Sequence, residues 1–261
     1  MKLNKIMFFF ILALPISIVL RGLQLLFTVD YVTGFYYGSK ETVGIILLIL
    51  ILLSAFFMGF FARQVFTRPE NSPKANIFTS LFSLLVCGAI FNENFIQAFP
   101  VSALPWQIAI LKITAVLISV YLLCVPLSLI FKFQIPSLLS VCPIIYLLMK
   151  IICDFTVVSK LAFISDNILM IAAYCLILLF FLNFGKLCTG INDDICFKKI
   201  LSYGLPAVML SLTCSIPNLA VNLILKEEYL HTSISASLSL LLFGILILSF
   251  LISYFYQKVK K

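Results

Sequence analysis

Residues 43–62 read VGIILLILILLSAFFMGFFA, an uninterrupted stretch without one charged side chain. A helix needs about 20 apolar residues to cross the roughly 30 Å hydrocarbon core of a bilayer. This stretch has the required length and composition, and Glu41 and Arg63 flank it on either side. It therefore predicts a transmembrane helix.

Similar stretches recur along the whole chain of 261 residues, which is 63% hydrophobic and only 11% charged. Its mean hydropathy is +1.18, whereas a soluble domain carries roughly a quarter charged residues. We therefore expect an all-α integral membrane protein with about eight transmembrane helices. The expected spans are 6–26, 43–62, 77–98, 107–131, 135–157, 163–184, 200–224 and 234–256.

The charges of the connecting segments alternate along the chain. One set of segments holds twelve basic residues, and the other holds only Lys40, Lys160 and Lys226. The twelve are Lys2, Lys5, Arg63, Arg68, Lys74, Lys132, Lys186, Lys198, Lys199, Lys258, Lys260 and Lys261. Because basic loops stay in the cytoplasm, this pattern predicts a multi-pass protein of the cell membrane with both termini cytoplasmic.

The formal net charge of +8 does not indicate nucleic acid as a partner. A nucleic-acid surface needs one basic stripe, whereas these residues are divided among short segments. In such segments they orient the helices and meet anionic headgroups. The expected partners are the lipid bilayer and anionic lipid.

Two parts of the chain resemble each other at a constant offset of 128 residues. Pro15 to Val29 and Pro143 to Val157 share Pro, Ile, Leu, Phe, Thr and Val at matching positions. We predict two four-helix halves, 1–132 and 133–261, within one membrane domain. Because four spans are an even number, the repeats would be parallel and related by an axis along the membrane normal.

Short motifs in both halves carry a resemblance to a group of proteins. They are Arg21 to Leu25 with Asp30, Thr33 to Tyr36, and Phe184 to Leu187. The chain resembles uncharacterised multi-pass membrane proteins of low-GC Gram-positive bacteria. The resemblance implies a bacterial cytoplasmic membrane and carries over no activity.

Ionisable residues inside spans are costly and so become candidates for a functional site. Lys150 and Asp154 are four residues apart, which places them on one helix face as a pair. They mark either a structural pair near a helix end or a site for a substrate or ion. Arg21 either anchors the first helix at the interface, with Asp30 as a partner, or faces the bundle.

The segment from Gly204 to Asn218 is the most polar of the predicted helices, and it contains Pro206 and Pro217. Proline frees backbone carbonyls inside a helix, so the segment either is simply kinked or lines a cavity. Arg21, Lys150, Asp154 and Asn218 together form the predicted in-membrane polar site.

Signatures of catalysis and of cofactor binding are missing from the sequence. A metalloprotease of the H-E-x-x-H type needs two histidines, and His231 is the only one. His231 with Glu227 and Glu228 suits an exposed helix end better than a metal site. Cysteines in apolar spans behave as small hydrophobic residues. We therefore expect no enzyme, no metal and no cofactor.

Two functions remain. The first is a small permease or the membrane subunit of a transporter, with an ATPase subunit as partner because the chain lacks a nucleotide-binding loop. The alternative is a non-transporting protein, such as an assembly factor, an immunity-type protein or a sensor scaffold, with a partner membrane protein. A transporter should gather its polar residues in one place, whereas a scaffold should scatter them.

Overall fold

The computed structural model describes residues 3–29, 36, 38, 40–64, 76–96, 104–131, 136–158, 165–188, 193–225 and 233–259. Eight long helices make up almost all of these residues. They are α1 (Leu3–Thr28), α2 (Glu41–Arg63), α3 (Ile77–Phe91), α4 (Pro105–Phe131), α5 (Cys142–Val158), α6 (Ser165–Cys188), α7 (Asp193–Leu225) and α8 (Ile234–Val259). Two short elements continue the helical path, the π-helix η1 (Asn92–Ile96) after α3 and the 3₁₀ helix η2 (Ser137–Val141) before α5.

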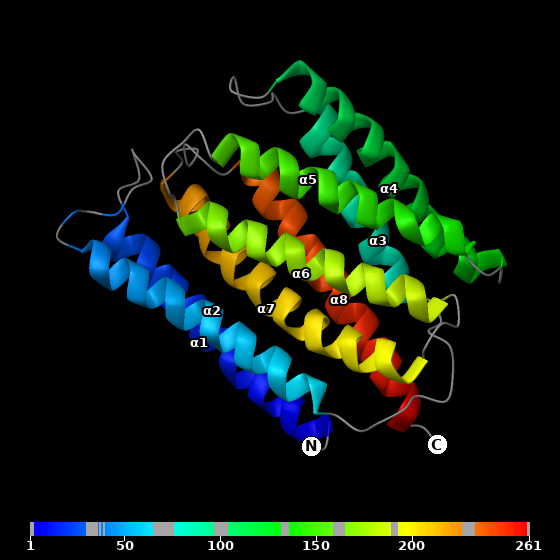
Figure 1. Ribbon diagram of the computed structural model, residues 1–261, viewed down its shortest axis with the longest axis horizontal. Helices are drawn as coiled ribbons and strands as arrows, with labels where there is room; N and C mark the ends of the chain where they lie inside the picture. Colours follow the sequence, from blue (N-terminus) through cyan, green and yellow to red (C-terminus); the bar gives the residue numbers. More distant parts are fainter. Residues whose placement is uncertain are drawn as a thin grey trace.

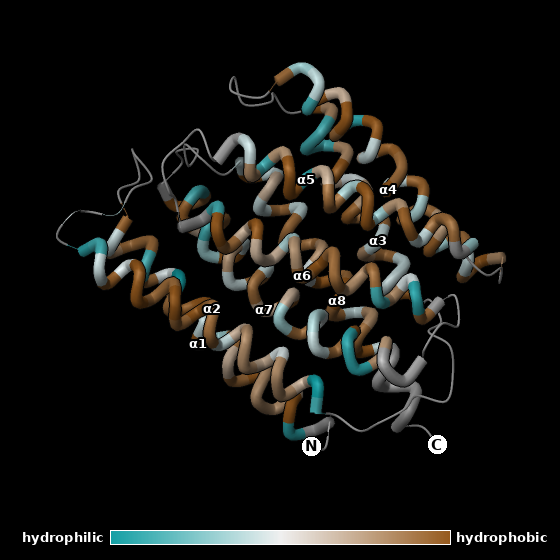
Figure 2. Tube along the Cα trace, in the orientation of Figure 1, coloured by the Kyte–Doolittle hydropathy of each residue, from teal (hydrophilic) through white to brown (hydrophobic). Residues whose placement is uncertain are grey.

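With η1 added to α3 and η2 to α5, each of the eight helices has the length and the apolar composition to span a membrane, as predicted. Most residues of α1 and α2 are hydrophobic, and the tubes of these helices are mainly brown in Figure 2. Phe56, Phe57 and Phe60 of α2 are each more than half exposed. Soluble monomers rarely expose apolar surface on this scale. These faces are therefore suited to contact lipid.

Helix α7 lies at the centre of the bundle (Figure 1). The α1–α2 pair packs against one side of α7, and α6 and α8 pack against the other. Helices α3, α4 and α5 complete the far side, where α3 contacts α8 and α5 contacts α6. In the most apolar window of α7, 72% of the residues are buried, against 22% in α1. The polar segment predicted from the sequence is thus the innermost helix.

Helix α7 runs without a break over 33 residues, although Pro206 and Pro217 lie inside it. At 1.5 Å per residue it is about 50 Å long, which exceeds the hydrocarbon core. Its buried face carries five polar side chains. They are Ser211, Thr213, Ser215, Asn218 and Asn222.

Aromatic side chains fill the space between α4, α6 and α8. Phe181 of α6 makes edge-to-face contacts with Tyr121 of α4 and Phe243 of α8, at 6.3 and 6.4 Å between ring centroids. Phe184 of α6 meets Phe250 of α8 at 5.0 Å. Such pairs stabilise packing beyond the area that they bury. This aromatic layer joins three helices that come from both predicted halves.

Helix α1 begins, and α8 ends, at the same end of the bundle (Figure 1). We call the opposite end, where α3, α5 and α7 end, the distal end. An even number of spans requires this arrangement of the termini. The side of the membrane that each end faces, and the two parallel repeats within 1–132 and 133–261, remain predictions.

Helices α2 and α7 approach closely at Gly59. The Ser202 hydroxyl of α7 donates to the Gly59 carbonyl at 2.8 Å. A Cβ atom on Gly59 would lie 2.8 Å from the Ser202 carbonyl oxygen and 3.2 Å from the Pro206 ring. Glycine at this position lets the backbones approach, as small residues commonly do between membrane helices.

We expect Gly59→Ala to lower the free energy of unfolding by about 1–3 kcal/mol, because the added methyl meets backbone that cannot move aside. Gly88→Ala is the matched control, since a Cβ atom there would meet nothing within 4 Å. Thermal unfolding of both variants in the same detergent measures the difference. Equal midpoints would show that the close contact between α2 and α7 does not constrain the bundle.

Candidate functional site

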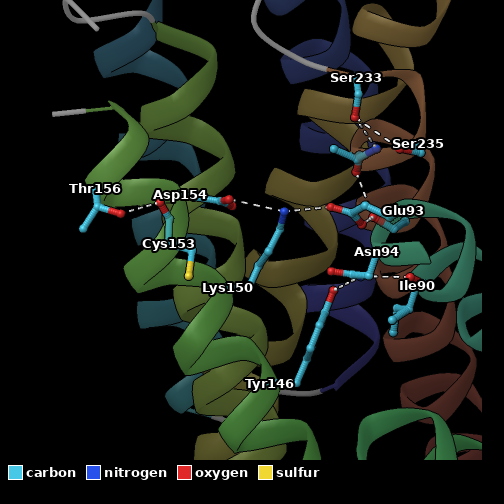
Figure 3. Close-up of polar contacts among 12 residues, drawn as sticks. Ile90, Glu93, Asn94, Tyr146, Lys150, Cys153, Asp154, Thr156, Ser233 and Ser235 are labelled. Carbon is cyan, nitrogen blue, oxygen red and sulfur yellow. Dashed lines mark hydrogen bonds and ion pairs between the residues drawn. The ribbon is translucent and has the colours of Figure 1, made fainter. Parts of the chain in front are cut away.

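Lys150 of α5 lies between two carboxylates (Figure 3). Its Nζ is 2.7 Å from Glu93 Oε1 and 3.2 Å from Asp154 Oδ1. The side chains of Lys150 and Glu93 are 11% and 8% exposed, so this ion pair lies inside the protein. The sequence placed Lys150 and Asp154 on one helix face, and their pairing is confirmed.

The π-helix η1 brings Glu93 to this position. A π turn is wider than an α turn, is rare, and occurs frequently at functional sites. Asn94 stabilises the turn by donating from Nδ2 to the Ile90 carbonyl at 2.8 Å, and the same amide lies 3.4 Å from the hydroxyl of Tyr146 on α5. The turn of α3 into η1 is therefore held against α5 on the same side as Lys150.

Helix α8 supplies the third contact of the cluster. The Ser239 hydroxyl donates to Glu93 Oε2 at 2.5 Å. Both oxygens of Glu93 therefore have a partner, Lys150 for one and Ser239 for the other. Hydrogen bonds to ionised groups are shorter and stronger than neutral ones. Glu93 thus ties η1 to α5 and α8.

Asp154 is less completely bonded than Glu93. Its Oδ1 faces Lys150, whereas its Oδ2 is buried and has no hydrogen-bond partner. The side chain as a whole is 25% exposed, because α5 ends four residues later at Val158. Asp154 therefore lies at the edge of the cluster, next to the distal end of the bundle.

The charges of the cluster do not balance. Glu93 and Asp154 supply two carboxylates, and Lys150 supplies one ammonium group. The remaining wall of the cluster includes Tyr174 of α6, whose ring centroid lies 6.0 Å from the Lys150 Nζ. A ring face stabilises a cation but does not neutralise a carboxylate. With all three groups ionised, the site carries one excess negative charge in surroundings of low dielectric constant.

A second buried polar cluster lies between α1 and α2. Arg21 is completely buried and donates from Nη1 to Gln24 Oε1. Gln24 Nε2 then donates to the Tyr36 hydroxyl at 2.7 Å and to the Gly44 carbonyl at 2.8 Å. Arg21 therefore faces the bundle and not the lipid. The Tyr36 ring lies directly against Gly44, where a side chain would displace it.

The four residues predicted to form one site do not lie together. Lys150 and Asp154 belong to the α3–α5–α8 side, whereas Arg21 belongs to α1, which packs on α7. Asn218 is buried on α7, with Nδ2 3.9 Å from Cys214 Sγ and without a hydrogen-bond partner for Oδ1. Asp30, the predicted partner of Arg21, lies outside the described residues, as do Glu227, Glu228 and His231.

Sequence reasoning did not predict the two contacts that complete the charged cluster. Glu93 and Ser239 lie 57 residues before and 89 residues after Lys150 in the chain, so no local spacing connects the three. One signal was present, since Glu93 is the acidic residue within the third span. A buried acid and a buried base in separate spans are candidates to pair. The contacts of Gln24 with Arg21 and Tyr36 were not predicted either, because they depend on the position of Tyr36.

Within the described ranges, no three His, Cys, Asp or Glu side chains gather as a metal site would require. Searches against protein-family models, curated proteins and solved structures match nothing. The class of this protein therefore rests on its own fold and site. The chain forms an all-helical bundle with the features of a multi-pass membrane protein, with one buried three-charge cluster among its described residues.

We expect Ser239→Ala to lower the free energy of unfolding by about 1.5–3 kcal/mol, because it removes a hydrogen bond to a charged group. Ser249→Ala on the same helix is the matched control. Like Ser239, Ser249 has its hydroxyl within hydrogen-bond distance of the carbonyl three residues earlier, but no described carboxylate accepts from it. Thermal unfolding compares the two variants. An equal loss in both would mean that Ser239 does not stabilise Glu93.

Lys150→Met leaves the buried Glu93 and the partly buried Asp154 without their counter-charge, and we expect a loss of about 3–5 kcal/mol in unfolding free energy. Adding Glu93→Gln removes one of the uncompensated charges and should recover part of that loss. The comparison of single and double variants isolates the coupling between Lys150 and Glu93. A double variant no more stable than Lys150→Met would contradict an ion pair that stabilises the fold.

Proposed function

We propose that this protein belongs to the transport class, as a small permease or as the membrane subunit of a larger transporter. In this proposal it resides in the bacterial cytoplasmic membrane and has no enzymatic activity of its own. The cluster of Glu93, Lys150 and Asp154 forms the site where it handles a charged solute or ion.

The charged cluster is the observation that carries this proposal. Replacing a buried ion pair by well-packed hydrophobic residues is often neutral or stabilising, so folding alone does not require these charges. Ionisable residues in membrane spans mark ion pathways and proton relays in many membrane proteins. The cluster also joins η1, α5 and α8, so a change in its charge acts on three separate helices.

The neighbouring helices contain features that permit movement or local opening. The π turn of η1 widens the end of α3, and Pro206 and Pro217 interrupt the hydrogen bonding of the central helix α7. Buried polar side chains of α7, including Thr213 and Asn218, leave oxygen atoms without a hydrogen-bond partner. The separation of Arg21 from Lys150 and Asp154 is what a scaffold would show, whereas the charged cluster, the π turn and the prolines favour a pathway through the bundle.

Basic residues at the ends of helices support the proposed orientation. The helices alternate in direction, so the start of α1 and α7 and the end of α2 and α6 lie at the end of the bundle opposite to the cluster. These helix ends carry Lys5, Arg63, Lys186, Lys198 and Lys199. Positive charge on this side favours a cytoplasmic location for both termini, in contact with anionic lipid headgroups.

The proposal is tested by uptake into vesicles of phosphatidylethanolamine and phosphatidylglycerol that contain the purified protein. The vesicles receive a mixture of amino acids, sugars, nucleosides, carboxylates and inorganic ions, under an imposed sodium or pH gradient. Mass spectrometry then identifies the solutes retained. We expect at least one solute above the level in protein-free vesicles, at least tenfold less with Glu93→Gln, and unchanged uptake with the exposed Glu41→Gln as control.

A transporter subunit would need its partner for uptake, so native mass spectrometry of the protein from its own membrane accompanies the assay. A stoichiometric ATPase subunit supports the second form of the proposal. Absence of both uptake and an ATPase overturns it. A stoichiometric membrane protein without ATPase activity would instead favour the assembly, immunity or sensor alternative.

A further inference from the structure

We propose that the cluster of Glu93, Lys150 and Asp154 binds one exchangeable monovalent cation, a proton or a sodium ion, at Asp154. This inference rests on the proposed function, because it assigns the ion that the transport site would use. It requires only a binding equilibrium and can be tested without knowing the transported solute.

The charge count is the first reason. Within the part of the chain that the structure describes, Lys150 is the only cation that is ion-paired with Glu93 or Asp154. Two carboxylates that share one ammonium group retain one net negative charge. An unbalanced charge away from water is expensive, and such groups take up a proton or a counter-ion instead. A single positive charge restores neutrality, whereas a divalent ion would overshoot it.

The two carboxylates differ in how completely they are hydrogen-bonded. Glu93 accepts a 2.7 Å hydrogen bond from Lys150 and a 2.5 Å hydrogen bond from Ser239, so both of its oxygens are occupied as an anion requires. Asp154 has a longer contact of 3.2 Å to Lys150 and an Oδ2 that is buried without a hydrogen-bond partner. That oxygen is therefore the position left for a proton or a sodium ion.

Among the described residues, the other polar groups around the cluster add no further ion pair to either carboxylate. Tyr174 of α6 offers its ring to Lys150, and the Tyr146 hydroxyl on α5 meets Asn94 of η1. Lys112 of α4 lies over the Phe95 ring, with its Nζ 5.9 Å from the centroid. Helix α8 contributes the neutral hydroxyl of Ser239, and Cys153 is a buried thiol next to Asp154.

Access to the cluster follows from its depth. Asp154 is one-quarter exposed and lies two residues before Thr156, where the apolar stretch of α5 ends. Lys150 lies six residues before Thr156, which places it about 9 Å below the end of the apolar stretch at 1.5 Å per residue. Asp154 is therefore the member of the cluster nearest the distal side, from which a cation would enter, while Lys150 and Glu93 remain enclosed. A cation bound at Asp154 also weakens the ion pair between Asp154 and Lys150. Glu93 then remains as the partner of the ammonium group.

Two measurements on the purified full chain identify the cation. Equilibrium binding of radioactive ²²Na⁺ at neutral pH tests sodium, and infrared absorption of the protonated carboxyl C=O group in sodium-free buffer tests the proton. We expect either about one ²²Na⁺ per chain that acid displaces, or one protonated carboxyl group that persists to neutral pH and disappears on further titration. A chain that shows neither overturns the proposal.

Matched variants locate the site. Asp154→Asn and Glu93→Gln each leave one carboxylate facing Lys150, a balanced pair, so each should reduce sodium binding or the carboxyl band at least tenfold. Glu41→Gln removes an exposed carboxylate in the first turn of α2 and should change neither. Unchanged binding in a folded Asp154→Asn variant overturns the assignment, and Glu93→Gln provides the same test if Asp154→Asn does not fold.

The outcome is separable from that of the transport assay. Cation binding without solute uptake or an ATPase partner would leave this site standing and remove the proposed function. Solute uptake by a protein that neither binds sodium nor contains a protonated carboxyl group would support transport and overturn the cation site.

Discussion

A bilayer offers no water to its interior, and this constraint determines most of the structure. Every backbone amide and carbonyl must find a partner inside the protein, which leaves helices as the available solution for spans like residues 43–62. The same constraint governs side chains. Glu93, Lys150 and Ser239 satisfy one another across three elements, because water is not there to do so. The helical packing and the buried polar contacts of this protein therefore both follow from the absence of water in the bilayer interior.

Helix α7 shows how the bundle accommodates polarity. It is the most buried helix, yet it carries Asn218, two prolines and several hydroxyl groups, while the outward faces of α1 and α2 are apolar. In a soluble protein the polar helix would be expected at the surface. Here the solvent is apolar, so the polar helix lies innermost. The peripheral helices separate it from lipid.

The charged cluster combines a feature that sequence could predict with one that it could not. Lys150 and Asp154 are four residues apart, and helical periodicity alone places them together. Glu93 joins them only because α3 ends in a π turn and packs beside α5 and α8. That third charge changes the character of the site. With all three groups ionised, a neutral pair becomes a site with one excess negative charge.

The sequence by itself determined the class of protein, the number and position of the spans and the even count that brings both termini to one end, because apolar length is a local property of the chain. It also identified Arg21, Lys150, Asp154 and Asn218 as unusual residues in an apolar setting. Only the tertiary structure separated Arg21 from Lys150 and Asp154, buried Arg21 beside Gln24 and brought Glu93 to Lys150. Those outcomes depend on which helix faces meet, and in an apolar chain many faces are nearly equivalent. Helix pairing is therefore decided by sparse contacts such as Gly59 with Ser202, which no local pattern specifies.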